Sequence, residues 1–123
     1  MKICGLHHVQ LAMPKGEEDA ARTFYQGALG FKEVEKPPIL AARGGVWFEQ
    51  GTVRLHLGVE EDFRPAGKAH PAFEVSGLQE LFAYLKSAGT SVQRDSALPG
   101  YRRGYIHDPF GNRIELLEPD SQT

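Results

Sequence analysis

The sequence predicts an α+β protein built from two copies of one strand–helix–three-strand module. Short stretches alternate apolar and polar residues, which is typical of strands with one buried face. Two longer stretches carry apolar residues at helical spacing, and each ends at a glycine. The two halves of the chain also match each other at a constant offset, which indicates an internal repeat.

The first module opens with alternating residues at 6–13, which predict a strand with Val9, Leu11 and Met13 on one face. A helix is expected over 17–29, because its apolar residues recur at helical spacing and a glycine follows. The dipeptide Pro37-Pro38 predicts a loop, since proline cannot donate to a strand ladder. The remaining strands of this module are expected at 31–35, 46–49 and 53–59.

The second module follows a polar stretch that contains Pro65 and Gly67. A helix is expected over 78–88, where leucine and phenylalanine lie on one face and Gly89 ends the pattern. The turn at 108–112 has the proline and glycine that turn backbone angles favour. The strands of this module are expected at 69–75, 91–94, 104–107 and 113–117.

The repeat is clearest where Arg54–Leu57 matches Arg113–Leu116. At the same offset of 59 (113 − 54) Gly30 matches Gly89 and Gly45 matches Gly104. The first strands align His8 with His70 at an offset of 62 (70 − 8), because three extra residues precede the first helix. We therefore expect a single domain over residues 1–123, with module one at about 5–60 and module two at about 68–118.

Composition narrows the possible functions. The net charge of −2 gives no reason to expect a nucleic-acid partner, and no apolar run is long enough to span a membrane. Cys4 is the only cysteine, so no internal disulfide is expected. The first residues lack the apolar core of a signal peptide, and we expect a cytoplasmic protein.

A metal site is the main functional prediction. Two copies of a module usually associate about a pseudo-twofold axis, which would bring His8 opposite His70 and His56 opposite Glu115. Three imidazoles and one carboxylate suit Zn, Fe, Mn, Co or Ni. A lone strand histidine is more often structural, and the prediction depends on the repeat-related placement of all four. A bulge in the first strand would replace His8 with His7.

Four segments carry a resemblance to a known family. They are Leu6–Ala12, Ala21–Phe31, Lys68–Val75 and Tyr105–Leu116, and together they span nearly the whole chain. In these segments the chain resembles the glyoxalase / bleomycin-resistance / dioxygenase superfamily, also called vicinal oxygen chelate proteins. The resemblance implies paired βαβββ modules that form a cupped mixed sheet with the helices outside. It also implies a homodimer.

The resemblance implies that His8, His70 and Glu115 bind a divalent transition metal, with His56 at a fourth position that varies among members. Such a metal chelates substrate oxygens and acts as a Lewis acid, and Glu115 could move a proton. The expected chemistry is that of a lyase, an isomerase or a thiol transferase with a thiol co-substrate. The alternatives are a non-catalytic binder of an antibiotic or other small molecule, and an extradiol Fe(II) dioxygenase.

Four further residues are candidates for contact with a small-molecule substrate. Arg102 and Arg103 could reach an anionic group, or could equally be surface charges. Trp47 and Phe48 could form a pocket wall, or could equally belong to the core.

Overall fold

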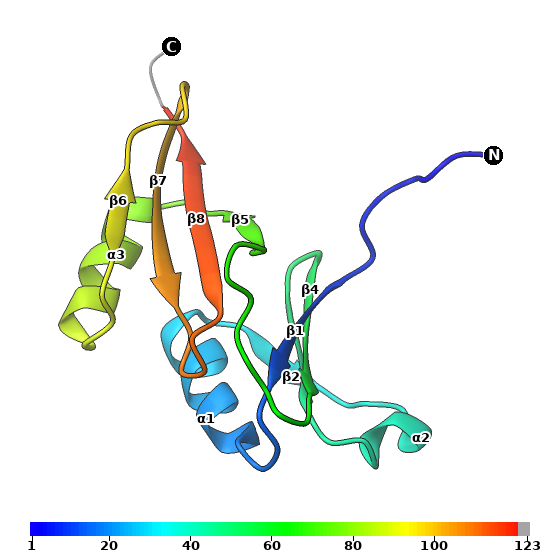
Figure 1. Cartoon of the computed structure of the whole chain (residues 1–123). Helices are drawn as coiled ribbons and strands as arrows, with labels where there is room; N and C mark the ends of the chain where they lie inside the picture. The colour runs from blue at the N-terminus through cyan, green and yellow to red at the C-terminus, as the bar shows by residue number, and fades with distance from the viewer. Residues whose placement is uncertain (121–123) are drawn as a thin grey trace. The chain divides into compact units, whose positions relative to one another are not determined.

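The structure is a computed structural model that describes residues 1–120 of the 123-residue chain. It divides into two compact units, Met1–Pro65 and Ala66–Thr123. Each unit holds a four-stranded mixed sheet, ordered β1-β4-β3-β2 in the first and β5-β8-β7-β6 in the second. The two orders are the same, so the predicted α+β fold with a tandem repeat is confirmed (Figure 1).

The first unit follows the predicted order of elements with one addition, a short helix. Its first strand pairs in parallel with its last, and the other strand pairs are antiparallel. The elements are β1 (Val9–Met13), α1 (Glu18–Arg22), the π-helix η1 (Thr23–Ala28), β2 (Lys32–Val34), α2 (Pro38–Ala41), β3 (Val46–Gln50) and β4 (Val53–Val59).

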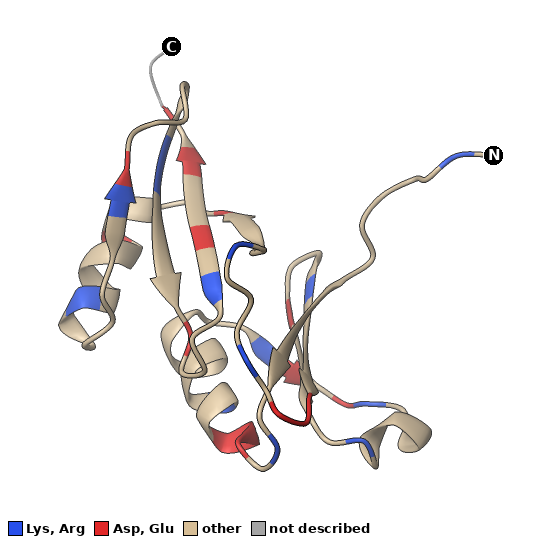
Figure 2. Cartoon of the chain, viewed as in Figure 1, with Lys and Arg blue, Asp and Glu red and all other residues tan. Residues whose placement is uncertain are grey.

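The second unit repeats this pairing pattern with one longer helix. Its elements are β5 (Ala72–Glu74), α3 (Leu78–Ser87), β6 (Gln93–Asp95), β7 (Tyr101–His107) and β8 (Arg113–Pro119). Among the described residues, no helix has both the length and the apolar character to cross a membrane. Acidic and basic residues are interspersed along both units (Figure 2).

Two predicted segments of the first unit differ in detail. The helix expected over 17–29 changes from α to π at Thr23, and the consecutive Phe24 and Tyr25 both lie in the core. The loop expected at Pro37-Pro38 instead begins helix α2. Proline fits the first turn of a helix, because its backbone angle is already helical and its missing N–H would have no partner there.

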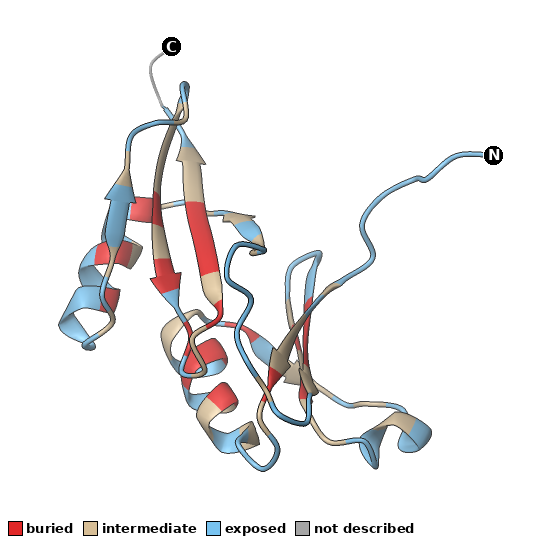
Figure 3. Cartoon of the chain, viewed as in Figure 1, coloured by how far each residue is buried: buried red, intermediate tan, exposed pale blue. Residues whose placement is uncertain are grey.

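Each unit has its own apolar core (Figure 3). In the first unit the Tyr25 ring packs against Phe31 and Phe48, with ring centroids 6.3 and 5.5 Å away. In the second unit α3 packs on β8 and buries Phe82. A side chain at Gly104 would lie 2.8 Å from the Phe82 ring, so the helix approaches the sheet closely at this glycine.

Strand β3 begins directly after Gly45, a residue with a positive φ of 86°. A Cβ atom at this position would lie 2.2 Å from the carbonyl oxygen of Leu57 on β4. The Gly45 N–H also donates to the Glu18 carboxylate at 2.9 Å, which ties α1 to this end of the sheet. No residue other than glycine fits this backbone without a shift of β4.

Candidate metal centre

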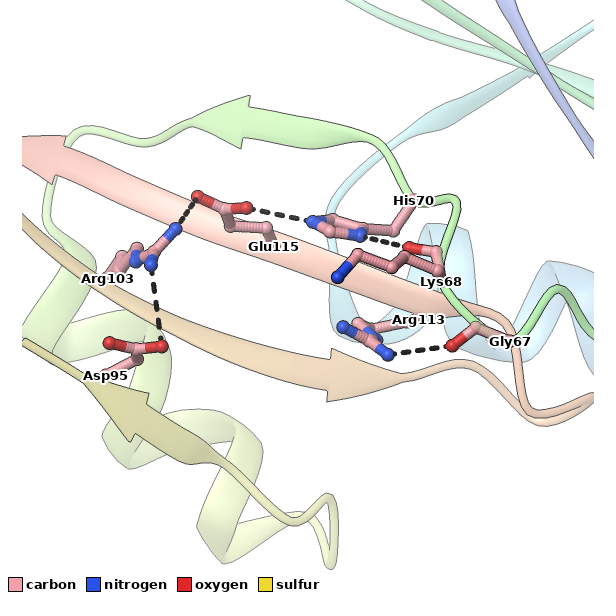
Figure 4. Close-up of polar contacts among 7 residues, drawn as sticks. All are labelled: Gly67, Lys68, His70, Asp95, Arg103, Arg113 and Glu115. Carbon is pink, nitrogen blue, oxygen red and sulfur yellow. Dashed lines mark hydrogen bonds and ion pairs between the residues drawn. The ribbon is translucent and has the colours of Figure 1, made fainter. Parts of the chain in front are cut away.

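The second unit brings His70 and Glu115 together (Figure 4). Glu115 lies on β8 between two apolar residues that face the core, and His70 lies just before β5. The His70 Nε2 atom is 3.0 Å from Glu115 Oε1, and Nδ1 is 2.8 Å from the Lys68 carbonyl oxygen. A carbonyl only accepts hydrogen bonds, so Nδ1 donates to Lys68, and Nε2 is the nitrogen that makes the hydrogen bond with the Glu115 carboxylate.

Arg103 holds the second oxygen of Glu115. Its NH1 group donates to Glu115 Oε2 at 3.1 Å, and its NH2 group is 3.4 Å from Asp95 Oδ2 (Figure 4). Burial alone would raise the pKa of Glu115, but hydrogen bonds from His70 and Arg103 outweigh it and hold the pKa below its usual value. Glu115 is therefore an oriented carboxylate at neutral pH, with Oε1 directed toward His70.

The first unit places His8 and His56 in a ring stack. Their ring centroids are 4.2 Å apart with an interplanar angle of 19°, and Trp47 covers the other face of His56 at 3.9 Å and 4°. Nitrogen lone pairs lie in the ring plane, so those of two nearly parallel rings do not converge on one point. A cation bound by both histidines would require one ring to rotate out of the stack.

Burial, together with smaller electrostatic effects of His8, His7 and Lys36 in the same direction, lowers the pKa of His56 to about 4. The imidazole is therefore neutral at neutral pH. A neutral imidazole is the form that binds metals and also the form that stacks without a charge penalty.

We expect His56 to protonate near pH 4 in an NMR titration of metal-free protein. The unfolded chain binds this proton near pH 6.5, so acidification from about 6.5 to about 4 should lower the free energy of unfolding. Replacing His56 with Gln should remove this part of the pH dependence, whereas replacing the exposed His107 should not. A His56 midpoint near 6.5 would contradict the expectation.

The four residues predicted to contact a substrate differ in burial and in their polar partners. Phe48 is fully buried in the core of the first unit, so its side chain offers no surface to a substrate. Arg102 binds Glu118 at 2.8 Å, and Arg103 is shared between two carboxylates as described above. Trp47 keeps partial exposure beside His56. Both arginines therefore already have acidic partners.

Comparison with known proteins identifies the family. The sequence profile of the Glyoxalase/Bleomycin resistance protein/Dioxygenase superfamily matches residues 5–116. The chain belongs to this superfamily. Members of the superfamily commonly use divalent metals. Comparison with curated proteins returned no match.

Solved structures of other proteins share the fold. A glyoxalase family protein from Bacillus anthracis is 46% identical, with a TM-score of 0.95 and coverage of 98% of each chain. The lactoylglutathione lyase from Agrobacterium tumefaciens is 22% identical, with a TM-score of 0.75 and coverage of 96% of each chain. An antibiotic binding protein from Streptomyces is 21% identical, with a TM-score of 0.74 and coverage of 97% of this chain and 100% of its own.

The spacing of the His70–Glu115 pair equals that of two neighbouring ligands of an octahedral ion. With bonds of about 2.1 Å such ligands lie about 3 Å apart, and His70 Nε2 is 3.0 Å from Glu115 Oε1. Within residues 1–120, no group of three or more His, Cys, Asp or Glu side chains gathers to hold a metal ion. The structure presents the candidate ligands as one pair in each unit, and the four-ligand set remains a prediction.

Sequence reasoning missed Tyr105. This residue is the cross-strand partner of Glu115, just as Trp47 is the partner of His56. The Tyr105 ring lies 5.5 Å from the His70 ring in an edge-to-face contact. At the offset that matches Gly45 with Gly104, Trp47 would correspond to Ile106. The strand register is one residue shorter and makes Tyr105 the counterpart of Trp47. Strand pairing, not residue matching, was the signal that could have found it.

Proposed function

We propose that this superfamily member is a divalent-metal-dependent enzyme whose small substrate chelates the metal through oxygen atoms. The supporting observation is the orientation of His70. Metal-binding histidines usually donate their second ring N–H to a backbone carbonyl or carboxylate, which fixes the ring and its tautomer. The Lys68 carbonyl accepts this bond from His70 Nδ1, so Nε2, which contacts Glu115 in the structure, is the ring nitrogen that would bind the metal.

The proposed ligands are His70 and Glu115 together with His8 and His56, the residues that the internal repeat pairs with them. This donor set suits Zn, Fe, Mn, Co or Ni better than the oxygen-preferring Mg or Ca. Arg103 holds one oxygen of Glu115 and so favours attachment through the other oxygen alone. Trp47 would keep the His56 ring in place from one side.

When bound, the metal would polarise two neighbouring oxygens of the substrate as a Lewis acid. The protein would orient that metal through His70 and supply a carboxylate, Glu115, whose low pKa keeps it charged. Such a site suits lyase, isomerase or thiol-transferase reactions, with a thiol as the second substrate in the last case. The shared fold with a lactoylglutathione lyase is compatible with this range.

Elemental analysis of protein purified without added metal tests the proposal. We expect one transition-metal ion per chain, and we expect His70→Ala to lose it while the far-ultraviolet circular dichroism stays unchanged. His107→Ala is the matched control, because this histidine is exposed at the end of β7 and should leave the metal content intact. An unchanged metal content in His70→Ala would reject the assignment.

The contrasting function is non-catalytic binding of an antibiotic or similar molecule. The shared fold with an antibiotic binding protein makes this role structurally feasible. Metal-free protein that still binds small aromatic molecules would favour it. Iron together with oxygen consumption on a catechol would instead favour a dioxygenase. A homodimer is also proposed, which light scattering tests against the 13.6 kDa mass of one chain.

A further inference from the structure

Two cationic side chains beside His70 have no acidic partner within residues 1–120. On this face of the second unit Arg103 is bound by two carboxylates, and on the opposite face Arg102 binds Glu118. Among the residues that the structure describes, neither Lys68 nor Arg113 forms an ion pair with Asp or Glu. The positive charge available to a ligand is therefore at Lys68 and Arg113, not at the arginines that the sequence suggested.

The Arg113 guanidinium is held in a fixed position. Its NH2 group donates to the Gly67 carbonyl oxygen at 2.9 Å, and its central carbon lies 5.6 Å from the centre of the Tyr105 ring. A guanidinium has five N–H donors, so most of them remain for a ligand. Ordering this side chain in advance lowers the entropy cost of binding an anion.

The same short segment connects both cations to the candidate metal ligands. Arg113 is anchored on Gly67, the neighbouring Lys68 holds His70 through its carbonyl, and His70 contacts Glu115 (Figure 4). On the adjacent strand, the Tyr105 ring lies close to both His70 and Arg113. An anion bound to Arg113 would therefore lie next to any molecule that occupies the His70–Glu115 pair.

We propose that Arg113, assisted by Lys68, binds a carboxylate of the substrate beside the metal site. This inference rests on the proposed function and specifies its substrate class. The substrate is a small organic anion that has metal-chelating oxygens at one end and a separate carboxylate at the other. The planar guanidinium fork matches the two oxygens of a carboxylate, and Lys68 adds a mobile positive charge.

The first unit offers a matched control at the corresponding repeat position. Arg54 aligns with Arg113, but its Nε atom is 3.9 Å from Glu49 Oε2 and its NH1 group is 3.5 Å from the His7 carbonyl oxygen. It therefore already has a carboxylate neighbour. The difference between these two arginines predicts that only Arg113 contributes to anion binding.

Calorimetric titration with two ligands tests the inference on protein as purified. The ligands are 2-hydroxysuccinate and its 4-amide, which share the chelating hydroxy-acid end and differ only in the charge of the far group. We expect the dianion to bind about tenfold more tightly than the amide, the usual size of one charge-assisted contact. Arg113→Gln should abolish this preference, Lys68→Gln should reduce it, and Arg54→Gln should leave it unchanged.

The inference is overturned if Arg113→Gln keeps the full preference for the dianion, or if the wild-type protein shows none. Metal content measured on the same samples distinguishes failure of this inference from failure of the proposed function. Arg113→Gln is expected to hold as much metal as the wild type, because Arg113 contacts neither His70 nor Glu115. Intact metal without a charge preference would reject the anion site alone, whereas absent metal would reject the metal site.

Discussion

Glu115→Gln should weaken metal binding on the order of a hundredfold in a competition titration against a chromophoric chelator. The substitution preserves the shape of the side chain but removes a buried negative charge, which is 8% exposed in the structure. Breaking one side of a buried charged pair costs about 3–5 kcal/mol, and each 1.4 kcal/mol corresponds to a factor of ten in affinity. The effect is large because the amide cannot balance the charge of the cation.

Glu118→Gln serves as the control on the same strand. The Glu118 carboxylate accepts hydrogen bonds from the backbone N–H groups of Gly77 and Leu78, and these bonds hold the pKa of Glu118 below its usual value. Its loss should lower the stability of the second unit and leave metal affinity unchanged. Equal metal affinities for Glu115→Gln and the wild type would exclude Glu115 as a ligand.

Gly45→Ala should lower the free energy of unfolding by about 3 kcal/mol or more, measured by urea denaturation. A left-handed backbone costs a residue with a side chain roughly 1–2 kcal/mol. The larger cost comes from the Leu57 carbonyl oxygen, 2.2 Å from the new methyl group. This neighbour is backbone of a central strand, so it cannot turn away as a side chain would.

Gly51→Ala measures the cost of the left-handed backbone conformation without the steric contact. Gly51 lies in the turn between the same two strands, also with a positive φ of 59°, and a Cβ atom there would have no neighbour within 4 Å. We expect it to cost only about 1 kcal/mol. An equal decrease in the free energy of unfolding for both variants would show that β4 shifts easily, and would contradict a large steric cost at Gly45.

The fold was predictable because the two modules resemble each other along the sequence. Alternation located the strands, and glycines located the ends of the helices. The boundaries were less predictable: the first strand begins at Val9, so His8 precedes it and does not lie on it as expected. Strand length depends on pairing with β4, which starts to pair with β1 at Leu55. Alternation alone cannot report where a partner strand ends.

The candidate site was predictable in part. His70 and Glu115 were predicted as two of four converging ligands, and the structure places their side chains 3.0 Å apart, while their role as metal ligands stays a prediction. The role of Arg103 could not be anticipated, since its two acidic partners lie on different strands from it. The stack of Trp47, His56 and His8 was also not foreseen. Ring orientation depends on side-chain torsions, which strand periodicity does not determine.

The pairing of β1 with β4 has a consequence for the order in which the chain folds. The strand that follows His8 cannot take its place until β4, the last strand of its unit, has been made. Closing such a long loop is slow compared with forming the local hairpin of β3 and β4. During synthesis the first unit can nevertheless complete its sheet before the second unit leaves the ribosome, because all of its strand partners come from its own half.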